Sequence, residues 1–291
     1  MALSKFLDPK NDVAFKKIFG SEKHKDILIH FINDVLELKD NDQIDEVEFL
    51  STIQDAEIAS KKQSIVDVLC RDKNGVQIIV EMQVAPTKGF EKRAQYYAAK
   101  AYSRQLNKGQ EADGLYENLK AVIFIAIADY IVFPDKTEFK SEHVILDKNS
   151  HEHDLQDFSF TFVELPKFKK EKIEELDTTL DKWCYFFKYA AKTSEADMAK
   201  IGSSYKTIGD AYEIVNQYNW SEQQLLAYER ETKRVWDNRS VLEFQLDKAK
   251  AEGMEQGMLK IAKDMTTKNY PLSEISALTG LSIDSIKELN K

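Results

Sequence analysis

Two acidic residues and a glutamine surround an Asn-Gly pair in the stretch "SIVDVLCRDKNGVQIIVEMQ", residues 64–83. Asp67 precedes the pair, and Glu81 and Gln83 follow it. Carboxylate oxygens are the ligands that a hard divalent cation such as Mg²⁺ prefers. A metal ion held by two acids can activate water for the hydrolysis of a phosphodiester bond, and a nearby amide can orient the water or a phosphate oxygen. Asp67 and Glu81 are therefore candidate metal ligands, provided that the fold brings them together.

The register of a β-hairpin decides whether the two acids meet. A two-residue loop at the Asn-Gly pair would place Asp67 opposite Met82 and mix polar with apolar residues on both faces. A three-residue loop that begins at Lys73, with Gly75 in the left-handed conformation, places Asp67 opposite Glu81. A slip of one residue moves every side chain to the other face, so the hydrophobic pattern selects the register. The three-residue loop makes one face wholly apolar: Val66, Val68, Cys70, Ile78, Val80 and Met82.

The other face of this hairpin carries both acids. An exposed sheet face often carries acidic residues that have no function. Here Ile65, Leu69 and Ile79 share the face with Asp67 and Glu81, which indicates that the face is partly covered. Cβ atoms of directly opposed residues lie about 4.5–5.5 Å apart, and covered carboxylates need a partner. We therefore favour a functional site over a plain surface.

Caps and apolar periodicity predict the elements that must position these residues. Asn11 or Asp12 can cap a short helix that ends at Gly20. Apolar residues at helical spacing predict two longer helices, over residues 27–36 and 90–106. β-branched or alternating runs predict strands over residues 46–50, 119–133, 142–147 and 157–165. From residue 169 onward the pattern is almost wholly helical.

The helix expected after the hairpin carries a basic and aromatic stripe. Arg93, Tyr97, Lys100 and Arg104 recur at helical spacing. Cations can contact DNA phosphates while the ring packs on a sugar. The alternative is that Tyr97 faces the core while the cations are merely solvated. The pattern leaves both interpretations open.

Composition limits the possible classes of protein. The 291 residues carry a net charge of -9, so any nucleic-acid site must be a local basic patch. The two cysteines, Cys70 and Cys184, are too few for a disulfide framework. The longest apolar run, residues 121–128, is too short to cross a bilayer, so we expect no membrane partner. A cytoplasmic location is the default expectation.

Four sequence blocks, in order, carry a family resemblance: "NDVAFKKIFG", "SIVDVLCRDKNGVQIIVEMQ", "KRAQYYAAKAYSRQLNKG" and "LKAVIFIAI". Over residues 8–135 the chain resembles the Rpn family of recombination-promoting nucleases, also described as PD-(D/E)xK transposases. The resemblance implies an α/β, restriction-endonuclease-like core, a mixed sheet flanked by helices, with an α-helical C-terminal extension.

The same resemblance implies metal-dependent cleavage of DNA and assigns roles to four residues. Asp67 and Glu81 would bind Mg²⁺ or Mn²⁺, and Gln83 stands where the family has the lysine that positions the attacking water. Asp12 would supply an additional acid. The leading hypothesis is therefore a Mg²⁺-dependent endodeoxyribonuclease linked to recombination or mobile elements. The alternative is a catalytically weak or inactive nuclease-fold module that binds DNA or a protein partner.

The C-terminal part has a different composition. We expect a nuclease-like domain over residues 1–225 and a helical tail over 226–291 that ends in a helix-turn-helix-like segment. Gly253 and Gly257 lie in the charged helix of this tail, and two helical glycines indicate close helix contact or fraying. The terminal segment has too many acids to suit phosphate, so we expect it to support protein–protein contact, including a possible homo-oligomer.

Overall fold

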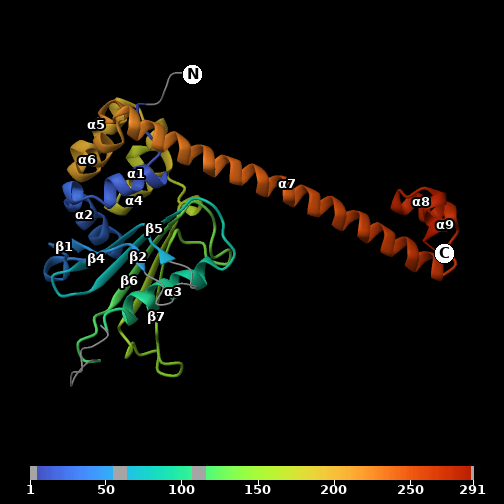
Figure 1. Ribbon diagram of the computed structural model, residues 1–291, viewed down its shortest axis with the longest axis horizontal. Helices are drawn as coiled ribbons and strands as arrows, with labels where there is room; N and C mark the ends of the chain where they lie inside the picture. The colour runs from blue at the N-terminus through green and yellow to red at the C-terminus, as the bar shows by residue number, and fades with distance from the viewer. Residues whose placement is uncertain (1–4, 55–63, 107–115, 290–291) are drawn as a thin grey trace. The chain divides into compact units, whose positions relative to one another are not determined.

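The computed structural model describes residues 5–54, 64–106 and 116–289 (Figure 1). The chain forms two compact units, Met1–Glu231 and Thr232–Lys291, and each is described by itself.

The first unit is built on a mixed six-stranded sheet in the order β1-β4-β5-β6-β8-β7. The strands of this sheet are β1 (Val47–Phe49), β4 (Val68–Asp72), β5 (Gln77–Gln83), β6 (Val122–Ala128), β7 (Lys140–Val144) and β8 (Phe158–Glu164). β5, β6 and β8 run parallel to one another, and the other neighbours are antiparallel. Two short strands, β2 (Ile53–Gln54) and β3 (Ser64–Ile65), form a separate pair.

β6 is shorter than the run predicted over residues 119–133, and β7 is displaced from its predicted range. β7 ends at Val144, whereas the sequence pattern placed a strand over residues 142–147. The cause is Asp147, whose side chain accepts hydrogen bonds from the backbone N–H groups of Asn149 (2.8 Å) and Ser150 (2.7 Å). Such a turn competes with the strand ladder, so the strand ends earlier.

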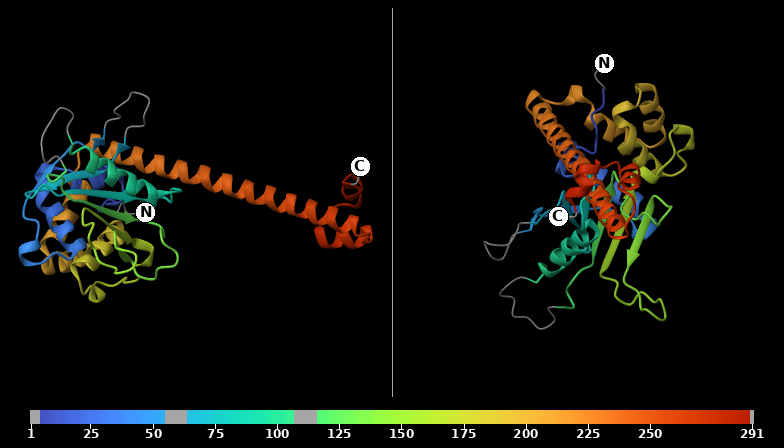
Figure 2. Two further views of the ribbon diagram at one scale, coloured as in Figure 1. Left: turned by 90° about the horizontal axis from the view of Figure 1, so that it is seen from below. Right: turned by 90° about the vertical axis from the view of Figure 1, so that its right-hand side faces the viewer.

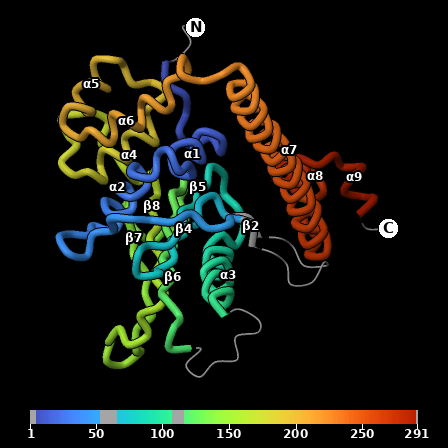
Figure 3. Tube along the Cα trace, turned by 60° about the vertical axis from the view of Figure 1, so that its left-hand side comes forward, coloured from blue at the N-terminus to red at the C-terminus, as the bar shows by residue number. Residues whose placement is uncertain are grey.

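Helices cover both faces of the sheet. One face packs against α1 (Asp12–Phe19), α2 (Lys25–Leu36), α4 (Thr179–Tyr189), α5 (Glu195–Ser204) and α6 (Lys206–Val215). The other face packs against α3 (Phe90–Ser103), and Figure 3 shows α3 lying apart from the larger helix group. Short 3₁₀ turns complete the unit: Glu22–His24, Asp40–Asp42, Leu165–Lys167, Ile173–Glu175, Ala190–Lys192 and Gln217–Asn219. The expected mixed sheet with flanking helices is confirmed.

Helix α1 begins and ends where its sequence indicates. The side chain of Asn11 accepts a hydrogen bond from the N–H of Val13 (3.0 Å), and the helix ends before Gly20. Its buried side chains all lie on one face: Ala14, Phe15, Ile18 and Phe19. This face anchors α1 in the core and leaves Asp12 and Lys16 less buried, so both can reach the hairpin.

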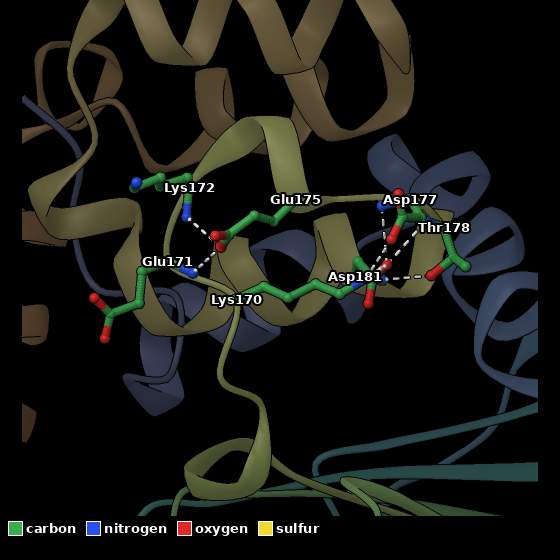
Figure 4. Close-up of polar contacts among 7 residues, drawn as sticks. All are labelled: Lys170, Glu171, Lys172, Glu175, Asp177, Thr178 and Asp181. Carbon is green, nitrogen blue, oxygen red and sulfur yellow. Dashed lines mark hydrogen bonds and ion pairs between the residues drawn. The ribbon is translucent and has the colours of Figure 1, made fainter.

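The start of α4 is fixed by a cluster of carboxylates and lysines (Figure 4). Thr178 and Asp181 cap each other, because the Thr178 hydroxyl accepts from the Asp181 N–H (3.0 Å) and Asp181 accepts from the Thr178 N–H (2.9 Å). Lys170 also donates to Asp181 (2.8 Å). Burial alone would raise the pKa of Asp181, but these bonds outweigh it and lower that pKa. The cluster therefore stabilises the helix that carries the core residue Trp183.

The second unit holds most of a long helix, α7 (Glu222–Thr267), followed by α8 (Leu272–Thr279) and α9 (Ile283–Glu288). Ala262, Ile275 and Ile286 form its small core. Figure 2 shows α7 unbroken along its length. A Cβ atom on Gly253 or Gly257 would meet no described atom within 4 Å, so close contact within the chain does not explain these glycines. None of the helices in the described residues is long and apolar enough to span a membrane.

Candidate active site

The hairpin adopts the register that pairs the two acids. β4 and β5 pair Leu69 with Ile79 and Arg71 with Gln77, and this register, continued beyond Val68, puts Asp67 opposite Glu81. Gly75 has a φ of 87°, in the left-handed region, as the three-residue loop requires. The prediction that the hydrophobic pattern selects the odd-length loop is confirmed.

Backbone N–H groups hold the side chains of Asp67 and Glu81. The N–H of Asp67 donates to Oε2 of Glu81 (3.1 Å), and the N–H of Met82 donates to Oδ2 of Asp67 (2.9 Å). Glu81 lies in the middle of the sheet with only 6% of its side chain exposed, and Asp67 has 17% exposed. These bonds orient both carboxylates toward the same region.

A bend in the backbone at Asp67 corrects one detail of the predicted faces. β4 begins only at Val68, after the bend. Val66 consequently packs with Leu69 and Ile79 on the α3 side of the sheet, not with Val68 on the opposite side. Strict alternation fails here because it holds only within a continuous strand. The rest of the predicted apolar face lies in the larger core as expected.

The local environment disfavours charge on both carboxylates. Burial raises the pKa of Asp67 to about 6, although the N–H of Met82 and the ammonium of Lys16 work against this rise. Burial and the neighbouring charge of Asp67 raise the pKa of Glu81 to about 8. Two carboxylates with raised pKa values form a site at which a bound cation would relieve the cost of ionisation.

Asp12 and Lys16 join the site from helix α1. They lie one helical turn apart, and Nζ of Lys16 is 2.7 Å from Oδ1 of Asp12 and 3.9 Å from Oδ1 of Asp67. Burial lowers the pKa of Lys16, but the bond to Asp12 and the charges of Asp67 and Glu81 outweigh this and raise it. Asp12 and Asp67 thus share the ammonium of Lys16.

Lys16 is the site residue that the sequence analysis missed. Its i, i+4 spacing from Asp12 was a visible signal.

Gln83 connects Glu81 to Arg93. Its Nε2 donates to Oε1 of Glu81 (2.9 Å) and to the carbonyl oxygen of Met82 (3.2 Å). Its Oε1 accepts a hydrogen bond from Nη2 of Arg93 (2.6 Å). Arg93 also lies 3.8 Å from Oε1 of Glu81. The amide therefore sits in the site, bonded on both sides.

The stripe on α3 separates into an inner and an outer part. Arg93 turns into the carboxylate site, and Tyr97 is partly buried against the α3-side core. Lys100 lies with Nζ 5.8 Å from the centre of the Tyr96 ring. Arg104 is exposed and lines a hollow of about 430 Å³, which Arg71, Lys120 and other residues also line. The structure places the four residues along one helix, with Arg93 beside Glu81.

The donor set suits a hard divalent cation. Among the described residues, no three His, Cys, Asp or Glu side chains come together as a metal-binding group. Asp67 and Glu81 would therefore supply two carboxylates, and water or a phosphate would complete the shell. Mg²⁺ usually keeps several waters and takes one or two protein carboxylates, so these residues fit it. The raised pKa values of the two acids also favour a bound cation, which would stabilise their ionised forms.

Comparison with known proteins gives one match. A family model described as "PD-(D/E)XK nuclease family transposase" matches residues 9–245, which include the hairpin, α1 and α3. No curated protein and no solved structure matches the chain.

Proposed function

Because the chain belongs to the PD-(D/E)XK nuclease family transposases, we propose that it is a divalent-metal-dependent endonuclease that hydrolyses phosphodiester bonds in DNA. The observation that carries this proposal is the convergence of the Asp67 and Glu81 carboxylates, which the N–H groups of Met82 and Asp67 hold at one place on the sheet. A bound divalent cation would relieve the cost of ionising both carboxylates and would supply the metal-ion chemistry of phosphodiester hydrolysis.

The reaction consumes water and needs no redox partner. The water oxygen forms a new bond to phosphorus, one P–O ester bond breaks, the water loses a proton, and the leaving alkoxide gains one. Asp67 and Glu81 would hold Mg²⁺ or Mn²⁺, which when bound lowers the pKa of water and neutralises phosphate charge. Gln83 orients the carboxylate of Glu81 through its Nε2. Arg93 in turn fixes the amide of Gln83.

We assign DNA contact to the outer part of α3. β5 carries Glu81 and α3 packs on the same side of the sheet, so a strand of DNA at the acids would run near this helix. Lys100 and Arg104 would contact phosphates, and Tyr97 would limit how closely the backbone approaches. Cleavage of this kind would act in recombination or in mobile elements, in the cytoplasm.

A homo-oligomer through the C-terminal helices is a separate proposal. The side chains of Trp236 and Phe244 on α7 are 68% and 70% exposed, and large apolar residues on a surface often mark an interface. Sedimentation equilibrium of the full chain and of a Trp236→Glu, Phe244→Glu variant tests it. The proposal predicts a dimer or larger species that the variant loses. A monomeric wild-type chain would contradict it.

Nicking of supercoiled plasmid tests the proposed activity. The wild-type chain, incubated with Mg²⁺ or Mn²⁺, should convert the plasmid to open circles, and EDTA should prevent this. Asp67→Asn and Glu81→Gln should each abolish the nicking while retaining the folded circular-dichroism spectrum. Wild-type protein that binds plasmid but leaves it intact with every metal would exclude the nuclease proposal and favour a binding module.

A further inference from the structure

The proposed site needs positive charge near the phosphate, and Gln83 does not supply it. Negative charge grows on the phosphate as water attacks, and a preorganised cation lowers that barrier. Gln83 is neutral, and both ends of its amide are bonded. Its Nε2 donates to Glu81 and its Oε1 accepts from Arg93. A cation on the chain that shares the phosphate charge with the metal would have to come from another residue.

Arg93 is already engaged inside the site. Its guanidinium donates to Gln83 at 2.6 Å and lies 3.8 Å from Glu81. The rings of Phe90 and Tyr97 flank it, with their centres 5.1 and 5.9 Å from its Cζ. These contacts make Arg93 a positioning residue that acts through Gln83 and Glu81.

Lys16 stands beside the carboxylate oxygen that is open to a ligand. Oδ2 of Asp67 accepts the N–H of Met82, whereas Oδ1 faces Nζ of Lys16 at 3.9 Å. That distance is too long for a direct hydrogen bond. The ammonium is instead bonded to Asp12 at 2.7 Å, and 42% of the Lys16 side chain is exposed. If a cation at Oδ1 of Asp67 binds a phosphate, that phosphate lies next to the partly exposed ammonium of Lys16.

We propose that Lys16 is a catalytic residue whose ammonium contacts a non-bridging oxygen of the scissile phosphate. It donates a hydrogen bond there and transfers no proton. Asp12 holds the ammonium in place in the free protein. Lys16 thus supplies, from helix α1, the positive charge that strand β5 lacks at Gln83. This inference rests on the proposed nuclease function.

A purely structural role for Lys16 makes a different prediction. In that case the ammonium only offsets the charges of Asp12 and Asp67 in the free protein. A bound divalent cation would then neutralise the carboxylates in its place. Removing the ammonium would leave the cleavage rate of the metal-loaded protein unchanged. Metal affinity and cleavage rate together separate the two roles.

The test compares three variants of the full chain. Lys16→Met removes the charge and keeps the stem, and Lys16→Arg keeps a cation. Lys17→Met is the matched control, because Lys17 lies next in α1 but bonds to Gln224 (3.0 Å) and lies over the Trp220 ring (4.0 Å). Single-turnover nicking of plasmid with Mn²⁺ and calorimetric Mn²⁺ binding without DNA are measured on each.

Lys16→Met should cleave about 100-fold more slowly or worse, the usual scale for losing one charge-stabilising donor. It should bind Mn²⁺ at least as tightly as wild type, because a nearby positive charge has gone. Lys16→Arg should recover part of the rate, and Lys17→Met should stay within about twofold of wild type. Wild-type-like cleavage by Lys16→Met, or a rate loss matched by an equal loss of Mn²⁺ affinity, would overturn the assignment. A wild-type chain that never cleaves would instead refute the nuclease function, and this inference with it.

Discussion

Replacing Asp67 with asparagine should make the metal-free protein more stable at pH 8. The substitution keeps the shape of the side chain and leaves an oxygen to accept the N–H of Met82. It removes the Asp67 carboxyl group, whose pKa is raised from 3.8 to about 6, mainly by burial. A rise of this size in the pKa corresponds to roughly 3 kcal/mol. The wild-type protein bears that cost whenever Asp67 is ionised.

The sign follows from proton binding. Between pH 3.8 and about 6 the folded state holds a proton on Asp67 that the unfolded state has lost, so stability falls as pH rises. The cost is complete above about pH 6 and absent below pH 3.8. Asp67→Asn should therefore gain about 3 kcal/mol at pH 8 and almost nothing near pH 4.

Urea denaturation in EDTA at pH 4, 6 and 8 measures this gain. Asp45→Asn is the control with the opposite sign, since Lys73 lies 2.7 Å from Asp45 and its bond lowers the pKa of that exposed acid. It should lose a little stability at pH 8. An Asp67→Asn protein that is no more stable than wild type at pH 8, or a gain that is the same at every pH, would refute the reasoning.

Three further predictions concern the hairpin, α3 and the core. Gly75→Ala should cost about 1–2 kcal/mol in urea denaturation, because its φ of 87° disfavours any Cβ and the added atom would lie 3.1 Å from the Lys120 side chain; an unchanged midpoint would contradict the observed turn. Arg104→Ala should weaken DNA binding and lower the slope of log affinity against log salt by about 1, and an unchanged slope would exclude a phosphate contact. Phe19→Ala should lower stability by about 3–5 kcal/mol, since the ring is fully buried in the core beneath α1, and calorimetric melting would show a smaller loss if the core could close around the gap.

The local parts of the site could be predicted from the sequence. The hairpin register follows from which residues are apolar, because a slip would expose them. Asn11 marks the start of α1 because its side chain accepts the N–H of Val13, and the helix ends before Gly20. These signals act within a few residues, so no knowledge of the tertiary fold is needed to interpret them.

The tertiary parts of the site could not be predicted in this way. Lys16 reaches Asp67 only because α1 packs against the sheet, and the two residues are far apart in the chain. The bend at Asp67 that moves Val66 to the other face leaves no mark on the alternating pattern. The stripe on α3 looks uniform in the sequence, yet Arg93 turns inward because Gln83 offers it an acceptor.

The central claim is that Asp67 and Glu81 together hold a metal ion that cleaves DNA. Calorimetric titration of Mn²⁺ into wild type and Asp67→Asn, with plasmid nicking assayed on the same two samples, tests it most directly. The account predicts that wild type binds Mn²⁺ and nicks plasmid, and that the folded variant does neither. Equal Mn²⁺ binding by both proteins, or nicking that survives in Asp67→Asn, would contradict it.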